Sequence, residues 1–306
     1  MRVATGVLAG WWVVACVLTL ARWLDLPGPL PLLQAGLVPV GLSLVPLLLC
    51  TVVLRRWLLV LSVLALGMVH LAIAIPWWID QGIDESEDDL IVAAINLEYG
   101  RGSMDDVEAL VQRHHVDVLV LIEATPATAR ALESSTLADD LPHRSGEVSP
   151  DASGTLVLTR APHEARESPP GFVFGQEIVD LGSDVTVVAA HTFPPVGSST
   201  QVWREELRTL GRGIEDEPTR GLVVLGDLNA STGHPALREL MTEQRLEAAH
   251  RVAGQGWVRT WPRNSQIPPF VQIDHVLVRG LDVVDAGTWP VADTDHLAVW
   301  ARLAAP

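Results

Sequence analysis

The chain has 306 residues, of which 48% are apolar and only 19% are charged. Soluble domains are about one quarter charged, so this composition excludes an intrinsically disordered chain, and the two cysteines exclude a fold held together by disulfides. The net charge of −16 argues against a general nucleic-acid binder, because such a protein needs a basic surface.

The charge is divided unevenly along the chain. Residues 1–78 carry four Arg and one acidic residue, a net charge of +3, whereas residues 79–306 carry 17 Arg and 36 acidic residues, a net charge of −19. Such an asymmetry predicts two parts that work in different environments. We divide the chain into a membrane anchor at 1–78, an acidic, solvated linker at 79–89 and a folded domain at 90–306.

Three apolar runs fill the anchor, and each approaches the roughly 20 residues that a membrane-spanning helix needs. These runs cover residues 3–21, 26–54 and 57–78. Trp residues concentrate here and several lie at the ends of the runs, as is typical of a membrane interface. The sequence therefore predicts three transmembrane helices. Cleavage of a signal peptide would remove only the first run, and the lipoprotein-like box that ends at Cys16 is followed by an atypically apolar segment.

The positions of Arg in the anchor predict its orientation. Arg2 precedes the first run and Arg55-Arg56 separates the second from the third, so the positive-inside rule places both on the cytoplasmic side. The loop around Asp25 and everything after Trp78 then lie outside the membrane. We therefore expect a multi-pass protein of a bacterial plasma membrane with an extracytoplasmic domain.

Residues 90–306 alternate short apolar runs with amphipathic segments, which predicts a layered α/β domain. Helices are expected after Ser103, from Thr125 to Ala131, and over residues 200–210. Strands are expected at residues 90–97, 116–122, 155–158, 173–181, 185–190, 222–225, 271–278 and 297–303.

Polar side chains interrupt the apolar pattern at or near the ends of these strands. An ionised carboxylate in such a place is costly unless it is paired or binds a metal. Each residue alone has an ordinary explanation as a turn, a cap or a buried imidazole, but nine of them in one domain are difficult to explain separately. They are Asn96, Glu123, His191, Asp227, Asn229, Asp274, His275, Asp295 and His296.

These residue types suit one kind of chemistry. The carboxylate and amide oxygens are hard ligands, which favour Mg²⁺ or Mn²⁺ over a Zn²⁺ held by thiolates. The imidazoles can donate to phosphate oxygens or exchange protons. A cation combined with imidazoles and carboxylates is what hydrolysis of a phosphoester requires.

The order of these motifs resembles the endonuclease/exonuclease/phosphatase superfamily, which includes DNase I-like nucleases, neutral sphingomyelinases and inositol-phosphate phosphatases. The resemblance covers residues 90–303 and implies a four-layered α/β/β/α sandwich. Thr294 stands where the family usually has Ser, and either hydroxyl can form a hydrogen bond there. The motifs are, in chain order, Asn96, Glu123, His191, Gly226-Asp227-Leu228-Asn229, Ile273-Asp274-His275 and Asp295-His296.

The resemblance also implies which residues bind metal. Glu123 is expected to be the principal metal carboxylate, with Asn96 and Asp295 beside it. His275 is expected to contact the substrate phosphate or to pack.

The remaining motif residues are expected to be catalytic. Asp227 would orient or deprotonate the attacking water, and Asn229 and His191 would hold phosphate oxygens. His296 would contact the phosphate or act as an acid or base, oriented by Asp274.

These expectations predict a Mg²⁺- or Mn²⁺-dependent phosphoesterase that acts outside the membrane. Trp261-Pro262 and residues 192–195 resemble loops of membrane-bound members of the family, including members associated with glycopeptide resistance. A phospholipid head group or a lipid-linked (pyro)phosphate is therefore the leading substrate class. No protein partner can be inferred.

Three alternatives agree less well with the sequence. An extracytoplasmic nuclease uses the same chemistry, but a domain of charge −19 repels a polyanion, so nucleic acid is disfavoured. A non-catalytic envelope binding module would have lost ligands, yet every expected position is filled. A transporter fragment is disfavoured because the apolar runs contain no acidic relay and no broken-helix repeat.

Overall fold

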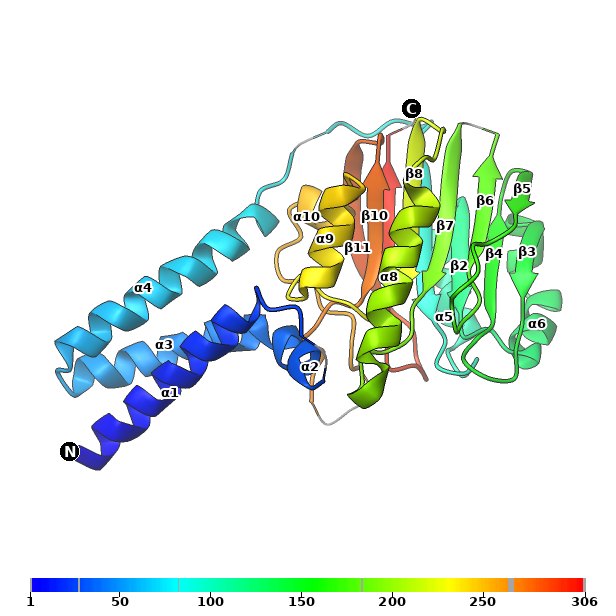
Figure 1. Cartoon of the computed structure of the whole chain (residues 1–306). Coiled ribbons are helices and arrows are strands. Elements are labelled where there is room, and N and C mark those ends of the chain that lie inside the picture. Colours follow the sequence, from blue (N-terminus) through cyan, green and yellow to red (C-terminus); the bar gives the residue numbers. More distant parts are fainter. Residues whose placement is uncertain (1, 27, 82, 183, 264–266, 305–306) are drawn as a thin grey trace.

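Figure 1 shows the computed structural model of the chain, which describes residues 2–26, 28–81, 83–182, 184–263 and 267–304. Two six-stranded sheets pack face to face, and helices cover the outer face of each sheet. A group of apolar helices projects from one side of this body. The body is the α/β sandwich that the sequence predicts.

The first sheet has the strand order β11-β12-β1-β2-β4-β3, with β1 and β2 parallel at its centre. Its outer face packs on α5 (Met104–His114), α6 (Pro126–Glu133) and α7 (Leu137–Asp140) through an aliphatic core. The strands are β1 (Leu90–Asn96), β2 (Val118–Ile122), β3 (His143–Glu147), β4 (Thr155–Thr159), β11 (Val283–Pro290) and β12 (Leu297–Leu303).

The second sheet has the order β5-β6-β7-β8-β10-β9, with β7 and β8 parallel. Its outer face packs on α8 (Thr200–Ile214), which follows the short η2 (Gly197–Ser199), and on α9 (Pro235–Glu243), while α10 (Ala249–Val252) lies at one edge. The strands are β5 (His163–Arg166), β6 (Glu177–Leu181), β7 (Val185–His191), β8 (Gly221–Asp227), β9 (Glu247–Ala248) and β10 (Asp274–Arg279).

Strand direction brings the predicted site together. β1, β2, β7 and β8 end at one edge of the sandwich, and β10 and β12 run antiparallel to their neighbours and begin at that edge. The C-terminus lies at the opposite, upper edge in Figure 1, so the edge that carries the strand-end residues is the lower one. Small β-branched and Ala side chains fill the space between the sheets.

The helix ends follow the capping chemistry of the sequence. Ser103 Oγ accepts the N–H of Asp106 at 3.2 Å and begins α5, which His115 ends in the left-handed conformation. Thr125 caps α6, as predicted. The predicted strand over 173–181 is shorter in the structure, because β6 begins only at Glu177.

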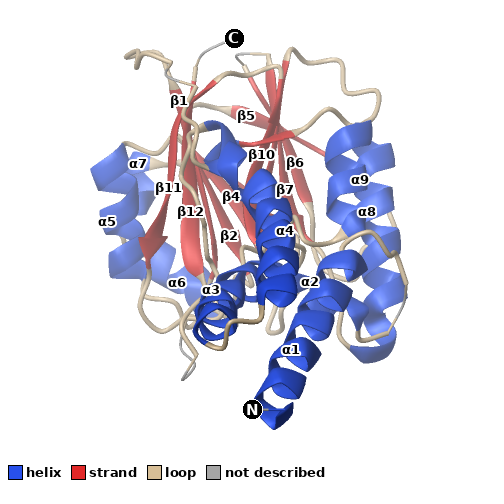
Figure 2. Ribbon diagram, turned by 90° about the vertical axis from the view of Figure 1, so that its left-hand side faces the viewer, coloured by secondary structure: helices blue, strands red, loops and turns tan. Residues whose placement is uncertain are grey.

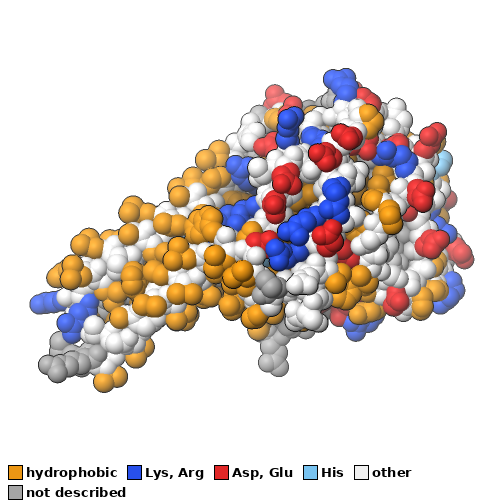
Figure 3. Space-filling model, viewed as in Figure 1, with side chains coloured by type: hydrophobic (Ala, Val, Ile, Leu, Met, Phe, Trp, Pro, Cys, Tyr) orange, Lys and Arg blue, Asp and Glu red, His pale blue; other side chains and the backbone are white. Residues whose placement is uncertain are grey.

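The apolar helices are α1 (Arg2–Ala21), α2 (Leu30–Ala35), α3 (Leu37–Val53) and α4 (Trp57–Ala74), and a short η1 (Ile75–Trp77) follows. Two helical stretches, Val3–Ala21 and Trp57–Trp77, are long and apolar enough to cross a membrane. Figure 3 shows apolar side chains over these helices, whereas charged side chains gather on the sandwich.

The second apolar run, residues 26–54, does not form one continuous helix. The run is broken at Gly36 into α2 and the 17-residue α3. In a continuous helix the N–H of residue 39 would bond to the carbonyl of Ala35, but residue 39 is Pro and has no N–H. A break at Gly36 places Pro39 in the first turn of α3, where an N–H would have no partner within the helix.

The segment after α1 and the start of α2 contact the sandwich directly. Arg22 Nη1 donates to the Thr232 carbonyl at 2.6 Å, and a ring nitrogen of His234 lies 2.8 Å from the Pro31 carbonyl. Asp25 forms an ion pair with Arg204 of α8.

Most of the described residues between 79 and 89 are exposed, and the segment contacts the sandwich at a few points. Asp80 forms a bridge with Ala253, and Glu85 pairs with Arg302 of β12. Between these contacts the side chains of Asp84, Glu87 and Asp88 are exposed.

Candidate active site

The side-chain amide of Asn96, at the end of β1, joins two carboxylates. Its Nδ2 donates to Glu123 Oε1 and to Asp227 Oδ2, at 3.1 Å each. Its Oδ1 accepts the N–H of Glu98 at 2.9 Å, while the second oxygen of Glu123 accepts the N–H of Tyr99 at 2.8 Å. The amide thus turns its NH₂ group toward the carboxylates, not the oxygen expected from the sequence, and Asn96 holds Glu123 and Asp227 together.

A histidine and two aspartates form the centre of the site. His296 Nδ1 lies 2.9 Å from Asp274 Oδ2, and its Nε2 is 3.9 Å from Asp227 Oδ2 and 3.7 Å from Asp295 Oδ1. Burial of the ring opposes protonation, but Asp274, through its charge and hydrogen bond, and then Asp227 and Asp295 raise the pKa of His296 to about 10. His296 is therefore an imidazolium at neutral pH, with Nε2 available as a proton donor.

Asp227 ends β8 in a position that only a preceding glycine allows. Gly226 has a φ of +142°, and a Cβ on it would lie 2.8 Å from Ile122 Cδ1. Burial, and then the charge of Asp274, raise the pKa of Asp227 to about 7. A carboxylate that titrates near neutrality is suited to accept a proton from water.

His191 and Asn229 flank Asp227. His191 Nε2 lies 4.0 Å from Asp227 Oδ2, and its ring stacks on Phe174 with centroids 4.3 Å apart. Burial and the charge of His296 lower the pKa of His191 to about 3, so this imidazole is neutral. The Asn229 N–H donates to Asp227 Oδ1 at 2.8 Å, whereas its side-chain amide donates to the carbonyl of Thr192.

Asp295 is held by groups from two loops. Trp261 Nε1 donates to Asp295 Oδ2 at 2.8 Å, and Glu98 Oε2 accepts the N–H of Asp295 at 3.0 Å. The neighbouring Thr294 donates its hydroxyl proton to the carbonyl of Asn96 at 2.7 Å. Thr294 thereby ties the start of β12 to the end of β1.

Of the two expected roles of His275, contact with the phosphate or packing, the structure shows packing, and His275 does not reach the strand-end site. Successive strand residues face opposite sides of a sheet, and Val276 belongs to the core between the sheets whereas Leu277 belongs to the outer core under the helices. Asp274 shares the inner side with Val276, so His275 faces outward with Leu277. A ring nitrogen of His275 contacts the carbonyl of Ala230 at 2.7 Å, and the residue is buried in packing.

Sequence reasoning missed Glu206, which is 1% exposed on α8. Its two oxygens accept the N–H groups of Phe193 at 2.5 Å and Val173 at 2.7 Å, and so position the loop that follows His191. Burial raises its pKa, while these two hydrogen bonds oppose the rise. The available signal was its place on the apolar face of α8, one turn after Trp203.

The loops around the site also carry unusual backbone. Non-glycine residues rarely adopt positive φ, and such conformations cluster at functional sites. Five residues at the strand ends do so here: Glu98, Tyr99, Glu123, Asn229 and Asp293.

The donor set fits a hard divalent cation. Ligand atoms of Asp227, Asp274 and His296 all lie within 4.8 Å of one another. Because Asp274 is engaged by His296 Nδ1 and Asp227 is suited to act as a base, the carboxylates left to hold a cation are Glu123 and Asp295. Burial raises the pKa of Glu123 as well as that of Asp227, and a cation would offset the cost of these charges. When bound, a cation would neutralise phosphate oxygens and stabilise charge on a leaving group.

The chain matches one known protein family. Residues 93–296 match the family described as the Endonuclease/Exonuclease/phosphatase family. No curated protein sequence shows significant similarity to the chain.

Solved structures with the same fold share little sequence with the chain. A D. rerio TDP2 complexed with a single-strand DNA product has a TM-score of 0.56 and 14% identity, over 71% of this chain and 100% of that one. An AP endonuclease from Archaeoglobus fulgidus has a TM-score of 0.55 and 14% identity, over 69% and 98%. Sphingomyelinase C from Streptomyces griseocarneus has a TM-score of 0.51 and 16% identity, over 71% and 99%.

Proposed function

The chain belongs to the endonuclease/exonuclease/phosphatase family and is a phosphoesterase, and from this premise we propose that it hydrolyses a phosphate ester carried by a membrane lipid, outside the plasma membrane of a bacterium. The observation that carries the proposal is the set of Asp227, Asp274 and His296 at the strand ends, beside the carboxylate of Glu123. Mg²⁺ or Mn²⁺ is the proposed ion, because the carboxylates that remain free to bind are hard oxygen donors.

In the proposed reaction Asp227 accepts a proton from the water that attacks phosphorus. The bond between phosphorus and the leaving oxygen breaks, and His296 Nε2 gives its proton to that oxygen. Asp274 keeps His296 charged and oriented, while His191 and Asn229, which flank Asp227, are assigned to the phosphate oxygens. Asp227, whose pKa is near neutrality, matches the role of base, and His296, which is a charged imidazolium, matches the role of acid.

The apolar helices of the anchor favour a substrate that lies in the membrane. We propose residues 1–78 as a three-helix anchor, with α3 as the third crossing, residues 79–89 as the linker and 90–306 as the catalytic domain. Asp25 contacts α8, which supports its location on the same side of the membrane as the sandwich. The turn at Arg55-Arg56 lies between α3 and α4, as expected for a cytoplasmic end.

A nuclease is the second candidate. It is favoured by the structural similarity to a TDP2 that was solved with a DNA product, but a net charge of −19 over residues 79–306 opposes the approach of a polyanion. A non-catalytic binding module is disfavoured, since an acid, a base and a carboxylate set are all in place.

A substrate panel tests the proposed function. The full-length chain in mixed micelles is offered a lipid pyrophosphate, sphingomyelin, inositol phosphates and duplex DNA, with EDTA and with added Mg²⁺, Mn²⁺ or Zn²⁺. We expect hydrolysis of a lipid substrate that EDTA abolishes and Mg²⁺ or Mn²⁺ restores, and a Glu123→Ala variant without activity. Cleavage of DNA alone would establish the nuclease, and restoration by Zn²⁺ alone would refute the hard-ligand assignment.

A further inference from the structure

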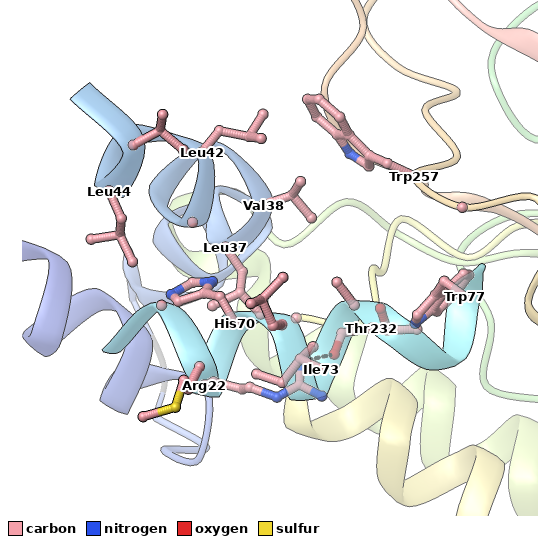
Figure 4. Close-up of a pocket in the computed structure, with 18 of the residues that line it drawn as sticks. Arg22, Leu37, Val38, Leu42, Leu44, His70, Ile73, Trp77, Thr232 and Trp257 are labelled. Atoms are coloured by element: carbon pink, nitrogen blue, oxygen red, sulfur yellow. Dashed lines mark hydrogen bonds between the residues drawn. The ribbon is translucent and has the colours of Figure 1, made fainter. Parts of the chain in front are cut away.

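An apolar groove of about 740 Å³ lies where α3 and α4 meet the sandwich. Figure 4 shows Leu37, Val38 and Leu42 of α3 on one side of it, and Thr232 and Trp257 of the sandwich at one end. Its volume falls within the range of sites that bind small molecules. The groove is therefore large enough for a ligand and is built jointly by the anchor and the domain.

The loops that line the groove also hold the active site. The lining segment 231–233 begins two residues after Asn229. Gln272, another lining residue, donates from Nε2 to the carbonyl of Asp274 at 3.2 Å. Val271 also lines the groove and pairs with Trp261, whose indole holds Asp295. Groove and site are thus two sides of the same loops.

The loop over residues 257–272 lies between the groove and the active site, and its net charge is positive in a strongly acidic domain. Residues 257–272 contain Arg259 and Arg263 and no acidic residue, whereas residues 79–306 together carry −19. At the groove itself, the guanidinium of Arg22 is held by the carbonyl of Thr232. An apolar groove with the guanidinium of Arg22 on its wall complements a molecule with a hydrocarbon chain and an anionic head.

The groove is also open on its anchor side. Leu42, Leu61 and Met68 line it and are 53%, 64% and 64% exposed. In a bilayer, apolar side chains left uncovered by protein face hydrocarbon, so a lipid chain is the occupant that this environment supplies.

We propose that the groove between α3 and α4 binds the hydrocarbon chain of the lipid whose phosphate is cleaved at Asp227 and His296. This inference rests on the proposed function. The chain lies along α3 and α4, and the head passes the loop of Arg259 and Arg263 to reach the strand ends. The groove, and not the catalytic residues, selects long-chain esters over short ones.

A matched pair of glycine substitutions tests the inference. Gly67 of α4 lines the groove, and a Cβ on it would meet no atom within 4 Å, so Gly67→Phe fills the groove without a clash at Cβ. Gly10 of α1 has equally open surroundings but lies outside the groove, so Gly10→Phe is the control. Neither residue belongs to the catalytic machinery.

The readout is the preference for a long chain. Full-length protein in mixed micelles is given methyl and hexadecyl p-nitrophenyl phosphate, which share the scissile bond. We expect kcat/KM to be at least tenfold higher for the hexadecyl ester in the wild type and in Gly10→Phe, and this preference to disappear in Gly67→Phe while methyl ester hydrolysis is unchanged. A preference that persists in Gly67→Phe, or that is absent from the wild type, overturns the inference. Failure to cleave either ester refutes the proposed function instead.

A binding experiment separates the substrate chain from ordinary membrane lipid. A hexadecyl phosphate with a photoreactive group in its chain should label α3 and α4 peptides of the wild type, and hexadecyl phosphate should compete with it at least tenfold better than hexadecanol. Equal competition by hexadecanol would mean that the groove holds lipid without regard to its head, and labelling confined to α1 would mean that the groove is not the site. Either result overturns the inference.

Discussion

Replacing Asp227 by Asn removes a buried charge, and we expect this to raise the stability of the fold but to lower turnover. Asp227 is 2% exposed, and burial together with the charge of Asp274 raises its pKa from the ordinary 3.8 to about 7 in the metal-free protein. The folded state therefore holds this proton more tightly than the unfolded state does. Ionisation of Asp227 destabilises the fold as pH rises between these two values, and the cost is complete above the folded-state pKa.

The magnitude follows from the shift. One pKa unit corresponds to about 1.36 kcal/mol, so the cost of the ionised Asp227 has an upper limit of about 4 kcal/mol. Asn keeps an acceptor for the N–H of Asn229 but loses the hydrogen bond from Asn96, which contributes about 1 kcal/mol. In EDTA at pH 8 we expect Asp227→Asn to be more stable than the wild type by up to about 3 kcal/mol, while its turnover falls by about 10²–10⁴ through loss of the base.

The assay is thermal unfolding of the full-length chain in detergent, followed by Trp fluorescence at pH 5 and pH 8, with EDTA or with Mg²⁺. The advantage of Asp227→Asn should be larger at pH 8 than at pH 5, and Mg²⁺ should stabilise the wild type more than the variant. A variant less stable than the wild type at both pH values would refute the account of the buried charge. Wild-type turnover would refute the role of Asp227 as base.

Three further substitutions test how the site is positioned. Asp274→Asn should lower the pKa of His296 and move the basic limb of the pH–rate profile to lower pH; an unmoved limb would show that His296 is not the acid. Glu206→Gln should lower kcat/KM about tenfold, because one of its two backbone partners loses an acceptor; unchanged kinetics would make its role purely structural. Trp261→Phe should weaken Mg²⁺ binding about tenfold in calorimetry, since partners of metal ligands contribute this much; unchanged affinity would mean that the indole does not position Asp295.

The interior of both sheets could be predicted from the sequence, and the edges could not. The eight strands expected from apolar runs correspond to the eight interior strands, β1, β2, β4, β6, β7, β8, β10 and β12. The four strands that were not predicted, β3, β5, β9 and β11, are the four sheet edges. An edge strand has a neighbour on one side only and is often kept polar, and His143–Glu147 and His163–Arg166 accordingly lack an apolar run.

Convergence of the site could be predicted because polar residues at the ends of parallel strands, and at the starts of antiparallel ones, meet at one edge. The direction in which each side chain points could not be predicted from the sequence. Because side chains alternate along a strand, only one residue of the pair Asp274-His275 can point between the sheets. The next two residues, Val276 and Leu277, are both apolar, so the sequence pattern does not indicate which of the pair points inward. The place of Glu206 on the apolar face of α8 indicates that it is buried, but it does not indicate its partners, which lie 13 and 33 residues away at Phe193 and Val173.

The break at Gly36 has a geometric consequence for the anchor. A single helix over residues 26–54 would be about 43 Å long at 1.5 Å per residue, well beyond a hydrocarbon core of about 30 Å. The 17 residues of α3 span about 26 Å instead, close to that thickness. In the proposed anchor α2 then lies outside the crossing and against the sandwich, where Pro31 contacts His234. Because α3 starts beside the domain loops, its first two turns, with Leu37 and Val38, line the groove next to Thr232. The break at Gly36 therefore keeps the start of α3, and with it the groove, beside the loops that also hold the catalytic residues.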